Sequence, residues 1–180
     1  MTPEEIIHFW AEKVGEARWF QSDPKLDSEI ASRFGNAYAL ARDGDLSEWE
    51  ETPQGALALL LLLDQFPRNM FRGRAEAFAT DAQARAIADY AIAHGFDLQV
   101  AQNLRAFFYL PFMHSEHMPD QERCVTLVTK RLGQHSHQYP YARAHRDVIA
   151  KFGRFPGRNA ALGRTSTPAE IEFLNSEPPF

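Results

Sequence analysis

Residues 56–74, with the sequence ALALLLLLDQFPRNMFRGR, constrain this fold more than any other part of the chain. The first eight of them, residues 56–63, are all apolar. A helix that is apolar on every side must be buried. We therefore expect a buried helix here, whose polar end reaches the edge of the core or a cleft.

The polar end of this segment carries one acid, Asp64. Because Asp64 directly follows the apolar run, we expect an arginine to form a salt bridge with its carboxylate; a role as general base is the alternative. The helix is expected to end at Phe66, because Pro67 disfavours helical geometry in the residue before it. The apolar run is too short to span a bilayer, which takes about 20 residues, so we predict no membrane span.

The rest of the chain also has a helical pattern. Apolar residues recur at intervals of three or four, and no alternating strand pattern is present. Capping boxes are expected at three helix starts: Thr2 with Glu5, Thr80 with Gln83, and Thr167 with Glu170. In the helix that follows Thr80, the buried stripe is expected to be Ala82, Ala86, Ile87, Tyr90 and Ala93. Residues 103–110 are expected to form a helix broken by Pro111.

These patterns predict an all-α fold, either an irregular bundle or an irregular array of antiparallel helical hairpins. With 180 residues the chain fits one domain, 1–180. The net charge of −5 argues against a nucleic-acid binder. Cys124 is the single cysteine and the first residues lack a secretory-signal pattern, so we expect a cytoplasmic protein.

One motif occurs twice in the chain. Phe-Pro-Arg-Asn at residues 66–69 returns as Phe-Pro-Gly-Arg-Asn at residues 155–159. We expect a core helix to end at each Phe-Pro break, with Gly153 stopping the helix before the second one, and Arg and Asn to leave the core together. In a structural interpretation they donate to carbonyls at a helix end. In a functional one, the arginines bind a carboxylate or phosphate.

Residues 110–122 contain the densest polar cluster. Imidazoles and carboxylates here could hold a metal, but their spacing matches no closed motif, so we predict no metal and no cofactor. The functional interpretation makes His114 an acid or base, assisted by Glu116 or Asp64. In the structural alternative, Ser115 or His114 starts a turn and Glu116 pairs with an arginine, Arg105 or Arg68. His145 lies on an apolar stripe and is expected to be buried and hydrogen-bonded by a neighbour.

Three motifs together carry a resemblance to a known family. They are LLLDQFPRNMFRG with AFATD, FFYLPFMHSE with Gln121, and FGRFPGRN with LGRTST. In this order they resemble the signatures of the bacterial family called domain of unknown function 924, over nearly the whole chain. The resemblance implies a tetratricopeptide-like helical fold, and the activity of that family is not established. It places at motif positions Asp64, Gln65, Arg68, Asn69, Arg72, His114, Ser115, Glu116, Gln121, His145, Arg154, Arg158 and Asn159. Gly157 stands where many relatives carry histidine, which counts against a mechanism that needs an imidazole there.

The favoured hypothesis is that the motifs form one polar site for a small anionic ligand or an acidic peptide end. The expected ligand-binding residues are Gln65, Arg68, Asn69, Arg72, Arg158 and Asn159. One alternative is a metal-independent hydrolase or lyase that uses His114 with Glu116 or Asp64. Another is a scaffold for a protein partner.

Overall fold

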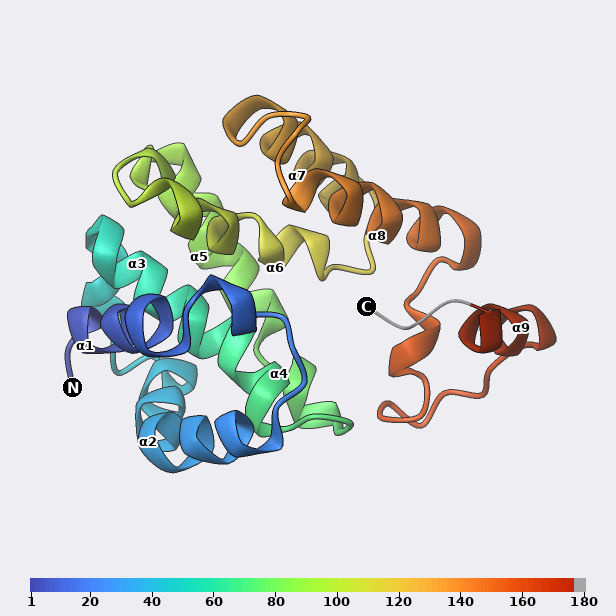
Figure 1. Cartoon of the computed structure of the whole chain (residues 1–180), viewed down its shortest axis with the longest axis horizontal. Coiled ribbons are helices and arrows are strands. Elements are labelled where there is room, and N and C mark those ends of the chain that lie inside the picture. The colour runs from blue at the N-terminus through green and yellow to red at the C-terminus, as the bar shows by residue number, and fades with distance from the viewer. Residues whose placement is uncertain (177–180) are drawn as a thin grey trace. The chain divides into compact units, whose positions relative to one another are not determined.

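The computed structural model describes residues 1–176 and contains two compact units. The first unit is Met1–Arg72 with Glu76–Pro111; the second contains Gly73–Ala75 and the chain from Phe112 onward. Every regular element in the described residues is a helix (Figure 1), which confirms the all-α prediction. The tetratricopeptide-like arrangement and the single domain stay predictions. Within residues 1–176, no helix has the length and apolar character needed to cross a membrane.

The first unit is built from α-helices joined by short 3-10 and π-helical turns. In chain order these are α1 (Pro3–His8), η1 (Phe9–Val14), η2 (Glu16–Arg18), α2 (Pro24–Asp43), η3 (Ser47–Glu51), α3 (Pro53–Leu60), η4 (Leu61–Gln65), α4 (Phe66–Met70), η5 (Ala75–Phe78), α5 (Asp81–Ala93), η6 (Phe96–Leu98), η7 (Gln102–Phe108) and α6 (Leu110–Met113). η5 and α6 each extend across a boundary between the units. The predicted capping box of Thr2 with Glu5 is confirmed at α1.

The predicted buried helix lies at the centre of this unit. Residues 55–67 are all buried. α3 packs against α1 and α5, and α4 packs against α2 (Figure 1). The polar residues that follow the apolar run are therefore carried by the most deeply buried segment of the unit.

The prediction that this helix ends at Phe66 is wrong. The chain widens into the π-helical turn η4, Phe66 keeps helical dihedrals (φ −65°, ψ −35°), and α4 continues to Met70. Pro67 lies in the first turn of α4, where a missing N–H is tolerated. The Leu63 carbonyl, four residues earlier, accepts a 2.6 Å hydrogen bond from the Thr80 hydroxyl instead. Thr80 thus supplies a side-chain donor to the turn in which Pro67 has no N–H.

Three further local predictions are wrong. Because Thr80 donates to Leu63, its side chain does not cap α5. Residues 103–108 lie in the 3-10 helix η7, whereas Leu110 already belongs to α6, and Pro111 lies in the first turn of α6 rather than breaking a helix. The buried face of α5 is rotated from the predicted stripe and consists of Asp81, Ala84, Ile87, Ala88 and Ala91.

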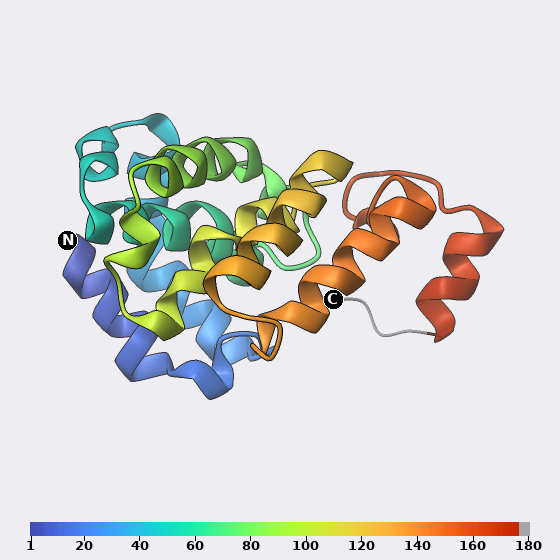
Figure 2. The same ribbon diagram turned by 90° about the horizontal axis from the view of Figure 1, so that it is seen from above.

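The second unit contains a helical hairpin and a short final helix. Its elements are α7 (Met118–Arg131), α8 (Gln138–Phe152), η8 (Pro156–Arg158) and α9 (Pro168–Ser176). α7 and α8 lie side by side (Figures 1 and 2). α8 ends at Gly153, as predicted, and the φ of 70° at this position suits glycine. Phe173 of α9 packs into an apolar cluster with Val148, Ile149 and Phe155.

Candidate functional site

In the first unit, Arg68 is paired with two buried carboxylates. Its Nη1 lies 3.2 Å from Asp64 Oδ1 and 3.0 Å from Asp81 Oδ1, and Nη2 lies 3.1 Å from Asp81 Oδ2. Nη1 also donates to the Asp64 carbonyl at 2.7 Å. Burial opposes the charge on Arg68, but Asp64 and Asp81 outweigh it and raise the pKa of the guanidinium. The expected salt bridge between Asp64 and an arginine is confirmed.

The other predicted ligand residues of this unit connect α4 to α2. Arg72 binds Asp27 through Nε (2.9 Å) and Nη2 (3.1 Å). Asn69 Nδ2 donates to Asp27 Oδ1 at 2.8 Å, and Gln65 Nε2 donates to Asn69 Oδ1 at 3.1 Å. These contacts hold the two helices together. A ligand-binding role for the four motif residues Gln65, Arg68, Asn69 and Arg72 stays a prediction.

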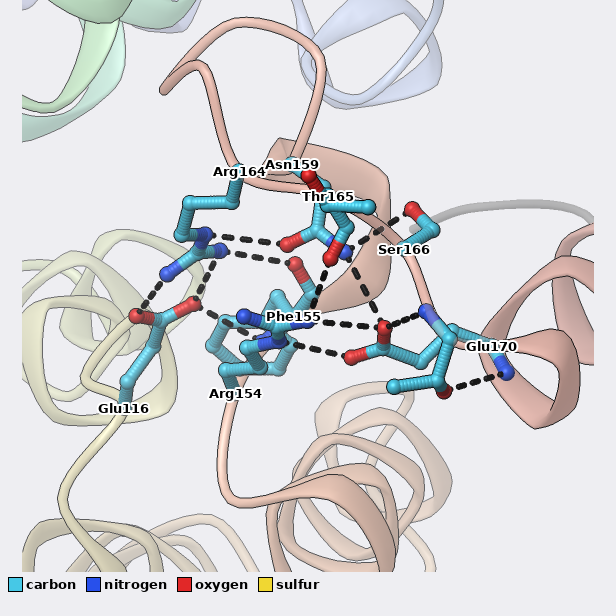
Figure 3. A network of polar contacts seen from close by, with 9 residues as sticks. Glu116, Arg154, Phe155, Asn159, Arg164, Thr165, Ser166 and Glu170 are labelled. Atoms are coloured by element: carbon cyan, nitrogen blue, oxygen red, sulfur yellow. Dashed lines mark hydrogen bonds and ion pairs between the residues drawn. The ribbon is translucent and has the colours of Figure 1, made fainter.

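In the second unit, the two terminal nitrogens of the Arg164 guanidinium both donate to the Glu116 carboxylate (Figure 3). The N···O distances are 2.8 Å from Nη1 and 2.9 Å from Nη2, and the Phe155 N–H donates to the same carboxylate at 2.8 Å. Burial would raise the pKa of Glu116, but the Arg164 and Phe155 hydrogen bonds lower it overall. The prediction that Arg105 or Arg68 pairs with Glu116 is wrong. Since a lowered pKa makes this carboxylate a weak base, the geometry argues against Glu116 as a proton acceptor.

A second ion pair lies beside the first. Arg154 binds Glu170 through Nε (2.6 Å) and Nη2 (2.8 Å), and the Thr167 N–H donates to Glu170 Oε2 at 2.7 Å. The hydrogen bond from Arg154, followed by that from the Thr167 N–H, lowers the pKa of Glu170 to about 2. The capping box of Thr167 with Glu170 is confirmed. The buried side chain of Asn159 joins the two pairs, since it accepts from Arg164 Nε at 2.9 Å and donates to Glu170 at 3.4 Å (Figure 3).

The segment around His114 is held by hydrogen bonds. Ser115 Oγ accepts from the His117 N–H at 3.2 Å, which confirms a turn at Ser115. Arg158 Nη2 donates to the His114 carbonyl at 2.7 Å, and its guanidinium lies 4.7 Å from the centroid of the Phe155 ring. Within residues 1–176, no three His, Cys, Asp or Glu side chains are grouped as a metal site. A catalytic role for His114 stays a prediction.

His145 has the predicted structural environment. It is 8% exposed, and its Nδ1 lies 2.9 Å from the Tyr141 carbonyl oxygen. Its ring also packs edge-on against Phe155, with 5.5 Å between the ring centroids. The prediction of a buried histidine that is hydrogen-bonded by a neighbour is confirmed.

An open pocket of about 540 Å³ lies between the end of α8 and the start of α9. Its lining residues are Lys151, Phe152, Arg154, Thr167, Ala169 and Glu170. Sequence reasoning placed Arg154 among the motif residues but missed Lys151. The path of the loop between α8 and α9 could not be read from apolar spacing, so no signal indicated this pocket.

Acid should weaken the second unit through Glu170. Its folded-state pKa of about 2 lies below the ordinary value of 4.5, so the carboxylate stabilises the fold above about pH 4.5. This contribution should be lost as the pH falls from about 4.5 to 2. We expect the melting temperature of Glu170→Gln to fall less steeply than that of wild type over this interval. Glu172→Gln, at an exposed position of the same helix, is the matched control and should follow wild type. Equal slopes for Glu170→Gln and wild type would contradict this assignment.

Comparisons with known proteins agree with the fold. The model of a family described as bacterial protein of unknown function (DUF924) matches residues 6–178. The solved structure of a protein of unknown function from Agrobacterium tumefaciens is 43% identical, with a TM-score of 0.92, and the match covers 97% of each chain. A search among curated proteins found no match. The resemblance carried by the three sequence motifs is therefore confirmed.

Proposed function

This chain belongs to the bacterial DUF924 family, and we propose that it binds a small anionic ligand in the pocket between α8 and α9. The observation that carries the proposal is the pair of cations in the lining of this open pocket, Lys151 and Arg154. A pocket of about 540 Å³ lies within the usual size range of small-molecule sites.

Lys151 supplies a positive charge that no carboxylate in residues 1–176 neutralises by a salt bridge. Its Nζ lies 4.9 Å from the centroid of the Phe152 ring and 5.8 Å from that of Phe173. Asp147, one turn earlier on α8, is bonded to Arg146 at 2.7 Å. Lys151 itself is exposed. An anion in the pocket can therefore approach this ammonium group without displacing a protein carboxylate.

Arg154 supplies a second donor, held in a fixed position. Glu170 occupies Nε and Nη2, and Nη2 also donates to the Thr165 carbonyl at 2.9 Å. In the described part of the chain, Nη1 makes no hydrogen bond. Because Glu170 fixes the plane of the guanidinium, little side-chain entropy is lost when Nη1 donates to a ligand.

The other candidate roles receive less support from the contacts. The guanidinium groups of Arg68 and Arg72 are already paired with carboxylates of the first unit. The enzyme alternative needs Glu116 or Asp64 to assist His114, but the Glu116 carboxylate is bound by Arg164 and the Asp64 carboxylate by Arg68. No observation favours the scaffold alternative, so anion binding in the second unit is the function we propose.

Isothermal titration calorimetry tests this function. Sodium phosphate, acetate, benzoate and 3-phenylpropanoate are titrated into the protein at constant ionic strength. We expect saturable binding of at least one anion, weakened about tenfold in Lys151→Met, because one charge-assisted contact is lost. Lys130→Met, at an exposed lysine of α7, is the matched control and should bind like wild type. No saturable binding in wild type, or equal binding in Lys151→Met, would contradict the proposal.

A further inference from the structure

We propose that the ligand of this pocket is an organic monocarboxylate with an apolar body, in preference to a phosphate. This inference rests on the proposed function and specifies its ligand class. Two properties of the pocket support this ligand class. The first is the net charge of the lining residues, and the second is the aromatic ring of Phe152 beside the Lys151 ammonium group.

The charges of the pocket lining favour a ligand with one negative charge. Lys151 and Arg154 are positive and Glu170 is negative, so the lining has a net charge of +1. Glu170 lies against Arg154 at 2.6 Å and is 2% exposed, which keeps this carboxylate in place. A carboxylate neutralises one positive charge. A phosphate near its second ionisation carries more charge than the lining can balance, and its excess charge would lie close to Glu170.

The size and lining of the pocket favour an apolar body on that carboxylate. A volume of about 540 Å³ is several times that of a carboxylate group, since a water molecule takes about 30 Å³. Phe152 and Ala169 bound the remaining space with apolar surface. Phe152 is half-buried, and its ring packs at a tilt against Phe173 with 5.2 Å between the centroids.

The position of Lys151 explains how one ligand can carry both a carboxylate and an apolar body. Its Nζ lies 4.9 Å from the centroid of the Phe152 ring. A carboxylate oxygen bonded to this Nζ at about 2.8 Å therefore lies within a few bonds of the ring. A spacer of two or three carbons between the carboxylate and an apolar group then allows contact with Phe152. The probe that fits this description is 3-phenylpropanoate.

The test compares dissociation constants of four probes, measured by calorimetry at one ionic strength. They are 3-phenylpropanoate, acetate, inorganic phosphate and the neutral alcohol 3-phenylpropan-1-ol. We expect 3-phenylpropanoate to bind at least about tenfold more tightly than each of the others, because only it combines one negative charge with burial of a ring. Lys151→Met should remove most of the advantage over the alcohol. Phe152→Leu should reduce the advantage over acetate, and Lys130→Met should change neither.

The outcomes separate this inference from the proposed function. If phosphate or acetate binds as tightly as 3-phenylpropanoate, and Lys151→Met weakens that binding, the ligand class is wrong while anion binding in the pocket stands. If the alcohol binds as tightly as 3-phenylpropanoate, the contribution of the charge is refuted. If no anion binds saturably, both proposals are overturned.

Discussion

Replacing Arg68 with methionine is expected to lower the free energy of unfolding by about 3–5 kcal/mol, the usual cost of removing one partner from a buried ion pair. The side chains of Asp64 and Asp81 are 2% and 11% exposed, and the variant removes the cation that both contact. Methionine keeps most of the apolar stem, so the loss reports mainly on the charge and its hydrogen bonds. Urea unfolding followed by circular dichroism measures the change.

Arg72→Met is the matched control for this experiment. Arg72 also pairs with an aspartate, Asp27, but its side chain is 47% exposed. Solvent-exposed pairs typically contribute less than about 1 kcal/mol, so this variant should lose little stability. A loss in Arg68→Met no larger than that in Arg72→Met would show that the charge of Arg68 is not needed for folding. Its role as a ligand residue would then be favoured.

The second large effect is expected at Thr80. Thr80→Val keeps the shape of the side chain but removes the hydroxyl that donates to the buried Leu63 carbonyl. Leaving a buried acceptor without this donor should cost about 1–3 kcal/mol. Thr80→Ser keeps the hydroxyl and is the conservative control, expected to lose less stability than Thr80→Val in the same urea titration.

A double-mutant cycle with Pro67 tests the reason for this effect. In Pro67→Ala, position 67 regains an N–H, four residues after the Leu63 carbonyl. Thr80→Val should therefore cost less in the Pro67→Ala background than in wild type, with a coupling of at least about 0.5 kcal/mol. An equal cost in both backgrounds would refute the idea that Thr80 replaces the donor missing at Pro67.

Sequence reasoning identified the features that depend on local pattern. The eight apolar residues at 56–63 predicted a buried helix, and Asp64 after them predicted a salt bridge with an arginine. Both are present because a fully apolar helix must be buried, and a charge at its end then needs a partner. The capping boxes at Thr2 and Thr167 are also local, since all their partners lie within three residues.

Features that depend on tertiary contacts were not predictable. Asp81 joins Arg68 from 13 residues away, and Arg164 reaches Glu116 from 48 residues away. Neither pair lies on one helix, where spacing would have brought the charges together. The face of α5 was assigned wrongly because its many alanines give the two sides similar hydrophobicity. The end of the buried helical segment was assigned wrongly because a π-helical turn and a distant threonine accommodate Pro67.

The repeated Phe-Pro motif illustrates the same limit. At Phe66-Pro67 the chain stays helical, whereas at Phe155-Pro156 it has already left α8 at Gly153, and Phe155 is extended (φ −88°, ψ 107°). The dipeptide restricts the backbone without deciding its conformation. The arginines that follow therefore have different environments, and only the second copy lies near the pocket residue Arg154 in sequence.

Mapping the binding site by NMR tests the central claim most directly, because it asks which arginine-containing segment meets the ligand. Wild-type protein labelled with ¹⁵N is titrated with 3-phenylpropanoate, and shifts of the backbone amides are followed to saturation. We predict that the largest saturable shifts fall at residues 151–154 and 167–170, the two ends of the pocket lining. Largest shifts at residues 64–72, or no saturable shift at any residue, would contradict the account.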